Sequence, residues 1–275
     1  MLNAIRDTAE AIAREAGAIV LQYAARPGQN QVSYKSSDID PVTEADKAAE
    51  AAIVRAIQAA YPDHHIHGEE GGGYGPPMEH APFGWFVDPI DGTTNFAHGF
   101  PHYAVNLSVV DAAGEPVVGI TYDPNRDECF SAVQGQGATL NGHPIHVSPV
   151  DLLLRALLST GFPYDRHTAR DNNTAAWAAF VRRTQGMRRV GSAALDIAYV
   201  ACGRLDAYWE RGVNSWDILA GILMVREAGG RVTRIDGTTA GLYEGGEVLA
   251  SNGHLHQTVM DILNDPSLRS AADLP

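Results

Sequence analysis

The stretch WFVDPIDGTTNF, from Trp85 to Phe96, joins an apolar run to a turn that carries two acids. The run predicts a buried strand that ends at Asp88, and the proline and glycine after it predict a tight turn. Asp91 lies three residues after Asp88, and Thr93 can cap a helix that begins after the turn. Carboxylates suit a hard cation, and the free N–H groups of a helix start suit a phosphate. The stretch therefore supplies both parts of a metal-assisted phosphate site.

The same stretch also has a purely structural explanation, because Asp-Pro and Asp-Gly are common turn dipeptides. It does not stand alone, however. Acid-bearing motifs recur along the chain, and the last of them opens an apolar run that is expected to be helical. These motifs are DPVTEAD at 40–46, GEE at 68–70 and SWD at 215–217.

In this order the motifs resemble those of the inositol monophosphatase family, the magnesium-dependent, lithium-sensitive phosphatases related in fold to fructose-1,6-bisphosphatase. The resemblance spans about residues 1 to 260 in one consistent order, which argues against chance agreement. No position at which the family places a metal ligand departs from its pattern. The remaining matches are KSS at 35–37, GSAA at 191–194, WDI at 216–218 and EAGG at 227–230.

The resemblance implies an α+β fold, a layered αβαβα sandwich of the inositol monophosphatase and fructose-1,6-bisphosphatase type. It also implies a single catalytic domain over residues 1–275, with two stacked halves at about 1–150 and 151–275, and a homodimer.

The hydrophobic pattern alone predicts alternating helices and strands. Residues 103–110 and 117–122 flank a Gly-Glu-Pro turn and predict a hairpin, so part of the sheet is expected to be antiparallel. Helices are expected over 2–23, 43–60, 172–185, 193–202, 216–228 and from about 252, with loops over 26–40 and 71–84. Strands are expected over 85–88, 103–110, 117–122, 128–133, 145–148, 156–160, 187–190, 205–209 and 231–235.

The charge balance narrows the classes of partner. The net charge is −13 and no basic patch is evident, so no nucleic-acid partner is expected. An acidic protein repels an anionic phosphate unless cations intervene, which favours a metal. Cys129 and Cys202 are far apart and fit no metal or redox spacing. The charged N-terminal segment resembles neither a secretory signal nor a membrane span, so we expect a cytoplasmic protein with no membrane partner.

Four acids, Glu69, Asp88, Asp91 and Asp217, are expected to converge on one pocket. A like-charged pair about 4 Å apart costs roughly 4 kcal/mol at an effective dielectric near 20, so such a cluster requires cations or protons. Two or three Mg²⁺ ions would remove the repulsion. The resemblance implies one ion on Glu69, Asp88 and the Ile90 carbonyl, and a second on Asp88, Asp91 and Asp217. A third, weaker ion would use Glu69 and water.

The resemblance also implies direct hydrolysis by a water activated on the metal that Glu69 binds. Thr93 would accept or orient the proton of this water, and Asp46 would bond Thr93 from behind. The N–H groups of Gly92 and Thr93 would bind the phosphate. Attack would be in line, without a phosphoenzyme.

Several of these residues have simpler explanations. Asp46 follows Thr43 by three residues, as in a capping box. Asp217 can be a first-turn acid that the helix dipole favours. Glu69 can be a surface acid, and Lys35, a possible active-site loop residue, can be a solvated charge.

Substrate contacts are implied by the resemblance alone. Gly191, Ser192, Ala193 and Glu210 match the positions that the family places against the hydroxyls of a polyol. Asp91, Gly92, Thr93 and Asp217 would complete the substrate-binding set. An ordinary strand-end charge paired with Arg211 is the alternative explanation of Glu210.

The continuation Thr94-Asn95-Phe96 resembles the inositol monophosphatases more than their relatives that act on histidinol phosphate, which implies inositol 1-phosphate as the substrate. Histidinol phosphate is the first alternative, and fructose-1,6-bisphosphate and 3′-phosphoadenosine 5′-phosphate stay open. A third hypothesis is a non-enzymatic, partner-binding module, against which the intact acid set argues.

Other chemistries find little support in the sequence. His64, His65 and His67 alternate along an expected strand and lack further Cys or His partners for zinc, so we interpret them as surface and core residues. The chain has no Gly-x-Ser-x-Gly motif and no Walker-type Gly-Lys-Ser/Thr motif, which argues against serine hydrolases and nucleotide triphosphatases.

Overall fold

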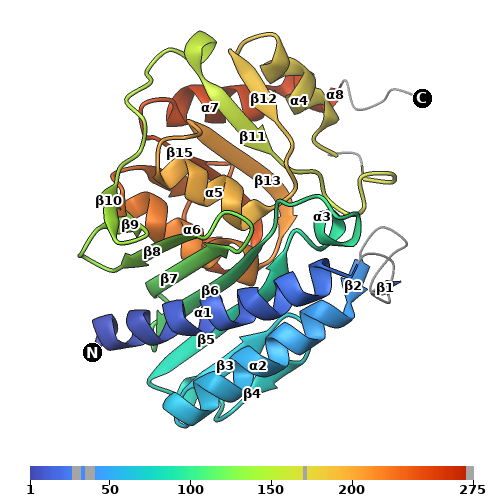
Figure 1. Ribbon diagram of the computed structural model, residues 1–275. Helices are drawn as coiled ribbons and strands as arrows, with labels where there is room; N and C mark the ends of the chain where they lie inside the picture. The colour runs from blue at the N-terminus through green and yellow to red at the C-terminus, as the bar shows by residue number, and fades with distance from the viewer. Residues whose placement is uncertain (27–31, 35–40, 170–171, 271–275) are drawn as a thin grey trace.

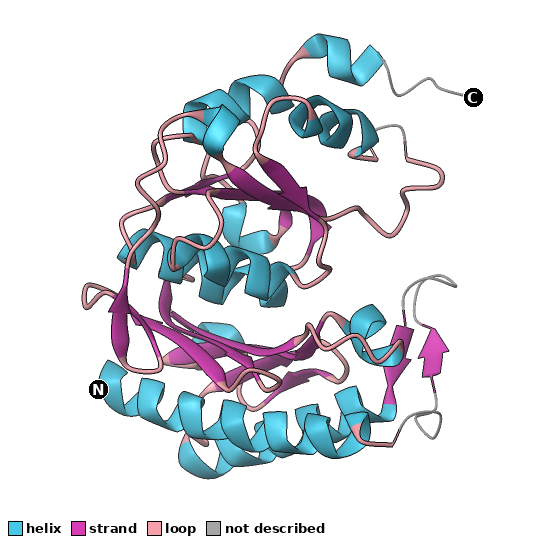
Figure 2. Cartoon of the chain, turned by 45° about the horizontal axis from the view of Figure 1, so that its top comes forward, coloured by secondary structure: helices cyan, strands magenta, loops and turns pink. Residues whose placement is uncertain are grey.

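The computed structural model describes residues 1–26, 32–34, 41–169 and 172–270 (Figure 1). Helices and sheets alternate in layers, and this confirms the expected αβαβα sandwich (Figure 2). The outer helices on one side are α1 (Leu2–Ala24) and α2 (Glu44–Ala60), the central helices are α5 (Ala193–Ala201) and α6 (Ser215–Glu227), and the helices on the far side are α4 (Thr174–Val181), α7 (His256–Leu263) and α8 (Pro266–Ser270).

The first sheet has eight strands in the order β10-β9-β8-β7-β6-β5-β3-β4. All neighbours in it are antiparallel except β3 and β5. Its strands are β3 (His65–Gly68), β4 (Gly72–Tyr74), β5 (Phe83–Asp91), β6 (Ala104–Asp111), β7 (Pro116–Asp123), β8 (Glu128–Val133), β9 (Ala138–Leu140) and β10 (His143–Ile145). The pairing of β6 with β7 confirms the predicted hairpin.

The second sheet has five strands in the order β12-β11-β13-β15-β14, and β11 runs parallel to both of its neighbours. Its strands are β11 (Leu157–Thr160), β12 (Gly186–Arg188), β13 (Ala207–Val213), β14 (Arg231–Thr233) and β15 (Gly246–Ser251). A separate antiparallel pair, β1 (Val32–Tyr34) with β2 (Pro41–Thr43), precedes α2.

Three apolar clusters hold the layers together. One lies between the first sheet and the two long helices, and includes Ile53, Trp85 and Ile120. The second joins the other face of that sheet to α5, α6 and the second sheet. Residues Ile218 to Val225 of α6 are all buried, because this helix is covered on both sides. The third cluster, around Trp209, packs the second sheet against its outer helices.

Some sequence predictions were wrong in detail. The segment 71–84 is not a loop throughout, because Gly72–Tyr74 forms an edge strand on β3. The strand expected over 85–88 begins earlier, at Phe83, and does not end at Asp88 but continues through a bulge to Asp91. The strand expected over 145–148 lies earlier, at 138–140 and 143–145, where Asn141 and Gly142 have positive φ and make a hairpin turn. Strand β15 was not predicted, and the final helix expected from about 252 is instead two helices, α7 from His256 and α8 from Pro266.

Other elements differ in length or place. The helix expected over 172–185 is only eight residues long, from Thr174 to Val181. The strand expected over 205–209 runs instead from Ala207 to Val213, and the one expected over 187–190 is Gly186–Arg188. Strand β1 falls within the expected loop 26–40. No helix in the described ranges is long and apolar enough to cross a membrane.

Candidate active site

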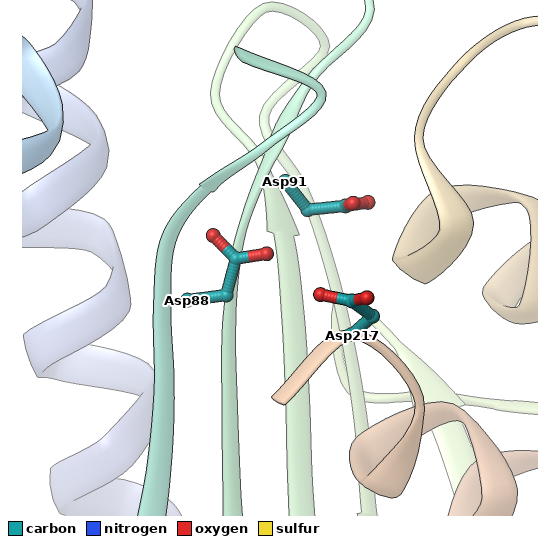
Figure 3. Close-up of side chains that lie close together, drawn as sticks. All are labelled: Asp88, Asp91 and Asp217. Atoms are coloured by element: carbon teal, nitrogen blue, oxygen red, sulfur yellow. The ribbon is translucent and has the colours of Figure 1, made fainter. Parts of the chain in front are cut away.

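Strand β5 brings two acids to one side of the first sheet. Side chains three residues apart in a regular strand face opposite ways. The register between β5 and β6 shifts between Asp88, which lies opposite Asn106, and Asp91, which lies opposite Ala104. Three residue steps on β5 thus match two on β6, as in a β-bulge, and Pro89 sits in this irregular part, where a missing N–H does no harm. The bulge lets both carboxylates reach the same pocket (Figure 3).

The third acid comes from the far half of the chain. Asp217 lies in the first turn of α6, where its Oδ2 accepts a hydrogen bond from the N–H of Asn214 at 2.7 Å. Asp88, Asp91 and Asp217 each offer one oxygen, and these oxygens all lie within 4.8 Å of one another. Figure 3 shows the three carboxylates turned toward a common space between β5 and α6.

This cluster is electrostatically costly without a cation. Burial, and then Glu69, Asp91 and Asp217, raise the pKa of Asp88 well above its usual range. Burial likewise raises the pKa of Asp91 to about 6, and burial followed by Asp91 and Glu69 raises that of Asp217. A divalent cation would offset both the cost of burying these charges and their mutual repulsion, and carboxylate oxygens are its preferred ligands. The residues therefore fit a metal site.

Glu69 reaches the pocket from the neighbouring strand. It directly follows β3, and its N–H donates to the carbonyl of Val87 at 3.1 Å. The next two amides are held by the buried carboxylate of Glu50, which accepts from the N–H of Glu70 at 2.8 Å and from that of Gly71 at 2.7 Å. Glu69 lines the same pocket as the three aspartates.

Thr93 and Asp46 meet beside the cluster. The hydroxyl of Thr93 lies 3.3 Å from Oδ1 of Asp46 and 3.0 Å from the carbonyl of Ile90. The other oxygen of Asp46 accepts from the N–H and the hydroxyl of Thr43, at 2.8 and 2.5 Å. The capping box and the bond to Thr93 therefore occur together, one on each carboxylate oxygen.

Asp91 ties the two halves of the site together. Its Oδ2 accepts a hydrogen bond from the hydroxyl of Ser192 and another, at 2.8 Å, from the N–H of Ala194. Ser192 is the N-cap of α5 and is almost fully buried. Its single hydroxyl proton is used on Asp91, so this side chain has none left to donate to a substrate.

Two glycines let the halves approach at this point. Gly92 and Gly191 both have φ near +90°, where other residues are strained. A Cβ on Gly92 would lie 3.2 Å from the carbonyl of Gly191. Asn95 fastens the same junction, because its amide donates to the carbonyls of His102 and Val190 at 2.7 and 2.8 Å.

Glu210 lies on the pocket wall beyond the aspartates. It accepts a hydrogen bond from the hydroxyl of Tyr208, and burial raises its pKa to about 7. Its carboxylate fills the space above Gly161, where a Cβ would come within 2.0 Å of it. The alternative explanation pairs Glu210 with Arg211. The Nε of Arg211 lies 3.7 Å from Oε2 of Glu247.

The pocket has a volume of about 740 Å³. It is lined by the four acids and by Gly92, Thr93, Gly191, Ser192, Ala193 and Glu210, so all of these sequence candidates meet in one place. The predicted contribution of Lys35 lies outside the described residues.

Of the three histidines, His64 is a core residue, as interpreted from the sequence, whereas His65 and His67 are half-buried and not on the exposed surface. His64 is buried and accepts a hydrogen bond from the indole of Trp85 at 2.9 Å, and His65 bonds the carbonyl of Pro76. His67 stacks on Trp216.

Sequence reasoning missed two supporting residues, Glu50 and Asn106. A signal existed for Glu50, since a charge four residues after Asp46 falls on the face that carries Ile53 and Ile57. Asn106 gave a weaker signal, a single amide within a strand of apolar residues.

Together, the layered fold and the buried acid cluster define a metal-binding phosphatase. A sequence model of the inositol monophosphatase family matches residues 1–266. The chain belongs to the inositol monophosphatase family and is a phosphoric monoester hydrolase.

Individual relatives agree with this placement. An inositol-1-monophosphatase from Synechocystis sp. is 48% identical over 233 residues, which cover 85% of this chain and 80% of that protein. A protein named Nus factor SuhB from Pseudomonas aeruginosa is 42% identical over 262 residues, covering 94% and 96%. The structure of inositol monophosphatase from Anabaena (Nostoc) sp. matches with a TM-score of 0.85 at 42% identity, covering 95% of this chain and 96% of that one.

Proposed function

We propose that this protein hydrolyses inositol 1-phosphate to inositol and phosphate with Mg²⁺. The observation that carries the proposal is the set of three carboxylates within 4.8 Å of one another at the end of β5 and the start of α6. The similarity to the Synechocystis protein named inositol-1-monophosphatase supports the choice of substrate.

The metal ligands would come from both halves of the chain. Glu69, Asp88 and the carbonyl of Ile90 would hold one Mg²⁺, and Asp88, Asp91 and Asp217 a second, with a third ion at Glu69. When bound, these cations lower the pKa of water and neutralise the charge on the phosphoryl and leaving oxygens. The oxygen-only ligand set suits Mg²⁺.

Thr93 and Asp46 would manage the proton of the attacking water. When the hydroxyl of Thr93 donates to Oδ1 of Asp46, its lone pairs are free to accept a hydrogen bond from water. Asp46 is held for this purpose by Thr43, so its position is fixed before substrate arrives.

The substrate would lie between the start of α3 (Thr93–Ala97) and the start of α5. The N–H groups of Gly92 and Thr93 would bind phosphate oxygens. Backbone groups of Gly191 and Ala193, together with the carboxylate of Glu210, would contact the polyol hydroxyls. Ser192 would act by orienting Asp91 rather than by touching the substrate, because its hydroxyl is already used.

Phosphate release from a panel of substrates tests the proposal. The panel holds inositol 1-phosphate, histidinol phosphate, fructose-1,6-bisphosphate and 3′-phosphoadenosine 5′-phosphate, each with Mg²⁺ and with EDTA. We expect Mg²⁺-dependent turnover with a preference for inositol 1-phosphate, inhibition by Li⁺, and loss of turnover in Asp88→Asn.

Glu210→Gln is the matched test of substrate choice. It keeps the shape of the side chain but removes the charge that favours vicinal hydroxyls, so kcat/KM should fall on the polyol substrate more than on the nucleotide. If the protein prefers another substrate of the panel, the metal-dependent hydrolysis stands and the proposed substrate is wrong. Equal turnover with EDTA would refute the metal-dependent mechanism.

A second candidate role is the binding of a protein partner. It is favoured by the similarity to proteins named Nus factor SuhB. The Asp88→Asn variant separates the two roles, because it should lose hydrolysis and keep partner binding. We also propose a homodimer, for which light scattering should give twice the chain mass of 29.4 kDa.

A further inference from the structure

One buried side chain, on the strand next to that of Asp88, is hydrogen-bonded to the helix of Asp217. Asn106 on β6 lies directly opposite Asp88 in the antiparallel ladder and is fully buried. Its amide nitrogen donates to the carbonyl of Trp216 at 2.6 Å and to that of Asp217 at 3.2 Å. Asn106 therefore lies beside one cluster acid, Asp88, and is hydrogen-bonded to the backbone on both sides of another, Asp217.

Thr121 fixes which way this amide points. It lies opposite Asn106 on the next strand, β7, and its hydroxyl donates to Oδ1 of Asn106 at 2.7 Å. Directly opposed residues share one face of a sheet, so Asp88, Asn106 and Thr121 form a row across three strands. Because backbone carbonyls only accept hydrogen bonds, the NH₂ group must face α6 and the oxygen must face Thr121.

The body of α6 is held against the same sheet independently. A Cβ on Gly119 of β7 would lie 2.8 Å from both the Cα and the carbonyl oxygen of Ala220, so helix and sheet touch there through their backbones. This contact sets how close the helix lies. The bonds from Asn106 act one turn earlier, at the carbonyls that bracket the cluster acid.

We propose that Asn106 is a positioning residue for the acid cluster, and that Thr121 acts through it. Asn106 holds the first turn of α6 at a fixed distance from β5, and thereby sets the spacing between the carboxylates of Asp217 and Asp88. The proposal rests on the proposed function, in which these carboxylates share a metal. A merely structural Asn106 would support the stability of the fold and leave the metal affinity of the folded protein unchanged.

The test uses Asn106→Ala, the nearly isosteric Thr121→Val and the double variant, with Ser108→Ala as the matched control. Ser108 lies two residues along the same strand, is fully buried, and has a hydroxyl without a hydrogen-bond partner in the described part of the chain. Two readouts do not depend on activity. One is amide hydrogen exchange in EDTA at Ala220 and Gly221, whose N–H groups bond the carbonyls of Trp216 and Asp217 within the helix. The other is the Mg²⁺ concentration that gives half of the full rise in Tm.

We expect Asn106→Ala to raise the half-saturating Mg²⁺ concentration about tenfold and to speed exchange at the two amides, since loss of an outer-shell partner has effects of this size. Thr121→Val should shift both readouts in the same direction by less. The double variant should match Asn106→Ala, because in the described part of the chain the hydroxyl of Thr121 donates to Asn106 and makes no hydrogen bond to α6 itself. Ser108→Ala should match the wild type, and KM at saturating Mg²⁺ should change less than the Mg²⁺ dependence.

Unchanged Mg²⁺ half-saturation and unchanged exchange in both Asn106→Ala and Thr121→Val would overturn the proposal. So would a lower Tm with unchanged Mg²⁺ half-saturation, which would assign Asn106 to stability alone. If Asn106→Ala does not fold, Thr121→Val carries the test. A wild-type protein whose Tm ignores Mg²⁺ would contradict the proposed function instead, and the exchange measurement in EDTA would then decide the role of Asn106.

Discussion

The carboxylate of Asp91 accepts a hydrogen bond from the backbone N–H of Ala194 at 2.8 Å, and this bond joins the end of β5 to the start of α5. The N–H belongs to the start of α5, where helix amides lack partners within the helix. Asp91 thus stabilises a helix start through Oδ2 and is also one of the three acids of the cluster. Replacing Asp91 therefore tests both the acid cluster and the stability of the fold.

The first prediction concerns catalysis by Asp91→Asn. An amide can still accept from Ser192 and Ala194, so the fold should survive, but the charge that holds the cation is lost. We expect kcat/KM to fall by about a hundredfold or more, equivalent to about 2.7 kcal/mol of transition-state stabilisation. Asp261→Asn, an exposed change on α7, is the control. Turnover of Asp91→Asn equal to that of the control would contradict the metal assignment.

The second prediction concerns the pH dependence of stability without metal. Burial raises the pKa of Asp91 from 3.8 to about 6, so the folded protein binds this proton more tightly than the unfolded chain. Proton binding to Asp91 therefore stabilises the folded state. This stabilisation, about 3 kcal/mol at most, is fully present below pH 4 and is lost as the pH rises through 6. In EDTA, the Tm of the wild type should therefore fall relative to Asp91→Asn between pH 4 and 7. A Tm difference that does not vary with pH would refute the raised pKa.

The third prediction separates the two functions of Asp46. Thr43→Ala removes the hydroxyl of the cap but keeps the N–H that also holds Asp46, so it should cost about 1 kcal/mol of unfolding free energy with little change in kcat. Asp46→Asn can keep an acceptor for the N–H of Thr43 but weakens the bond to Thr93, so kcat should fall at least tenfold. Equal kcat losses in both variants would show that Asp46 matters only through the cap. Chemical denaturation and steady-state kinetics measure the two effects.

The fourth prediction concerns the contact between α6 and the first sheet. Gly119→Ala would place a methyl group 2.8 Å from the backbone of Ala220, which cannot move aside as a flexible side chain can. We expect a loss of about 1–3 kcal/mol of stability, from chemical denaturation. Gly73→Ala is the control, because among the described residues its Cβ would meet only the ring of His65, at 3.5 Å. Gly119→Ala with the stability of the control would contradict the tight contact.

The sequence allowed Asp88 and Asp217 to be predicted because each adjoins a change in the hydrophobic pattern, although Asp88 itself lies inside β5. Asp88 ends an apolar run, and Asp217 follows a serine that opens another, so local pattern placed both. Their convergence across about 130 residues was predicted from the family resemblance and not from any local pattern. The bulge that turns Asp88 and Asp91 to one side has no local signal beyond Pro89.

The supporting contacts were harder to predict, because they depend on register. Asn106 supports Asp217 only because β6 pairs with β5 at Asp88, and a shift of one residue would turn its side chain to the other face. Glu50 is a long-range partner of backbone amides twenty and twenty-one residues away. The hairpin at Asn141-Gly142, by contrast, carried a recognisable turn signal that the sequence prediction did not use.

The central helix α6 is buried on every side, and this affects how the chain must be made. The first sheet is complete at Ile145, yet the face that packs on α6 stays bare until residue 227 has been synthesised. At about 5–20 residues per second, the nascent chain exposes this apolar face for roughly 4–16 seconds. A chain truncated after residue 150 and released from the ribosome should accordingly bind a dye for apolar surfaces, and the full chain should not.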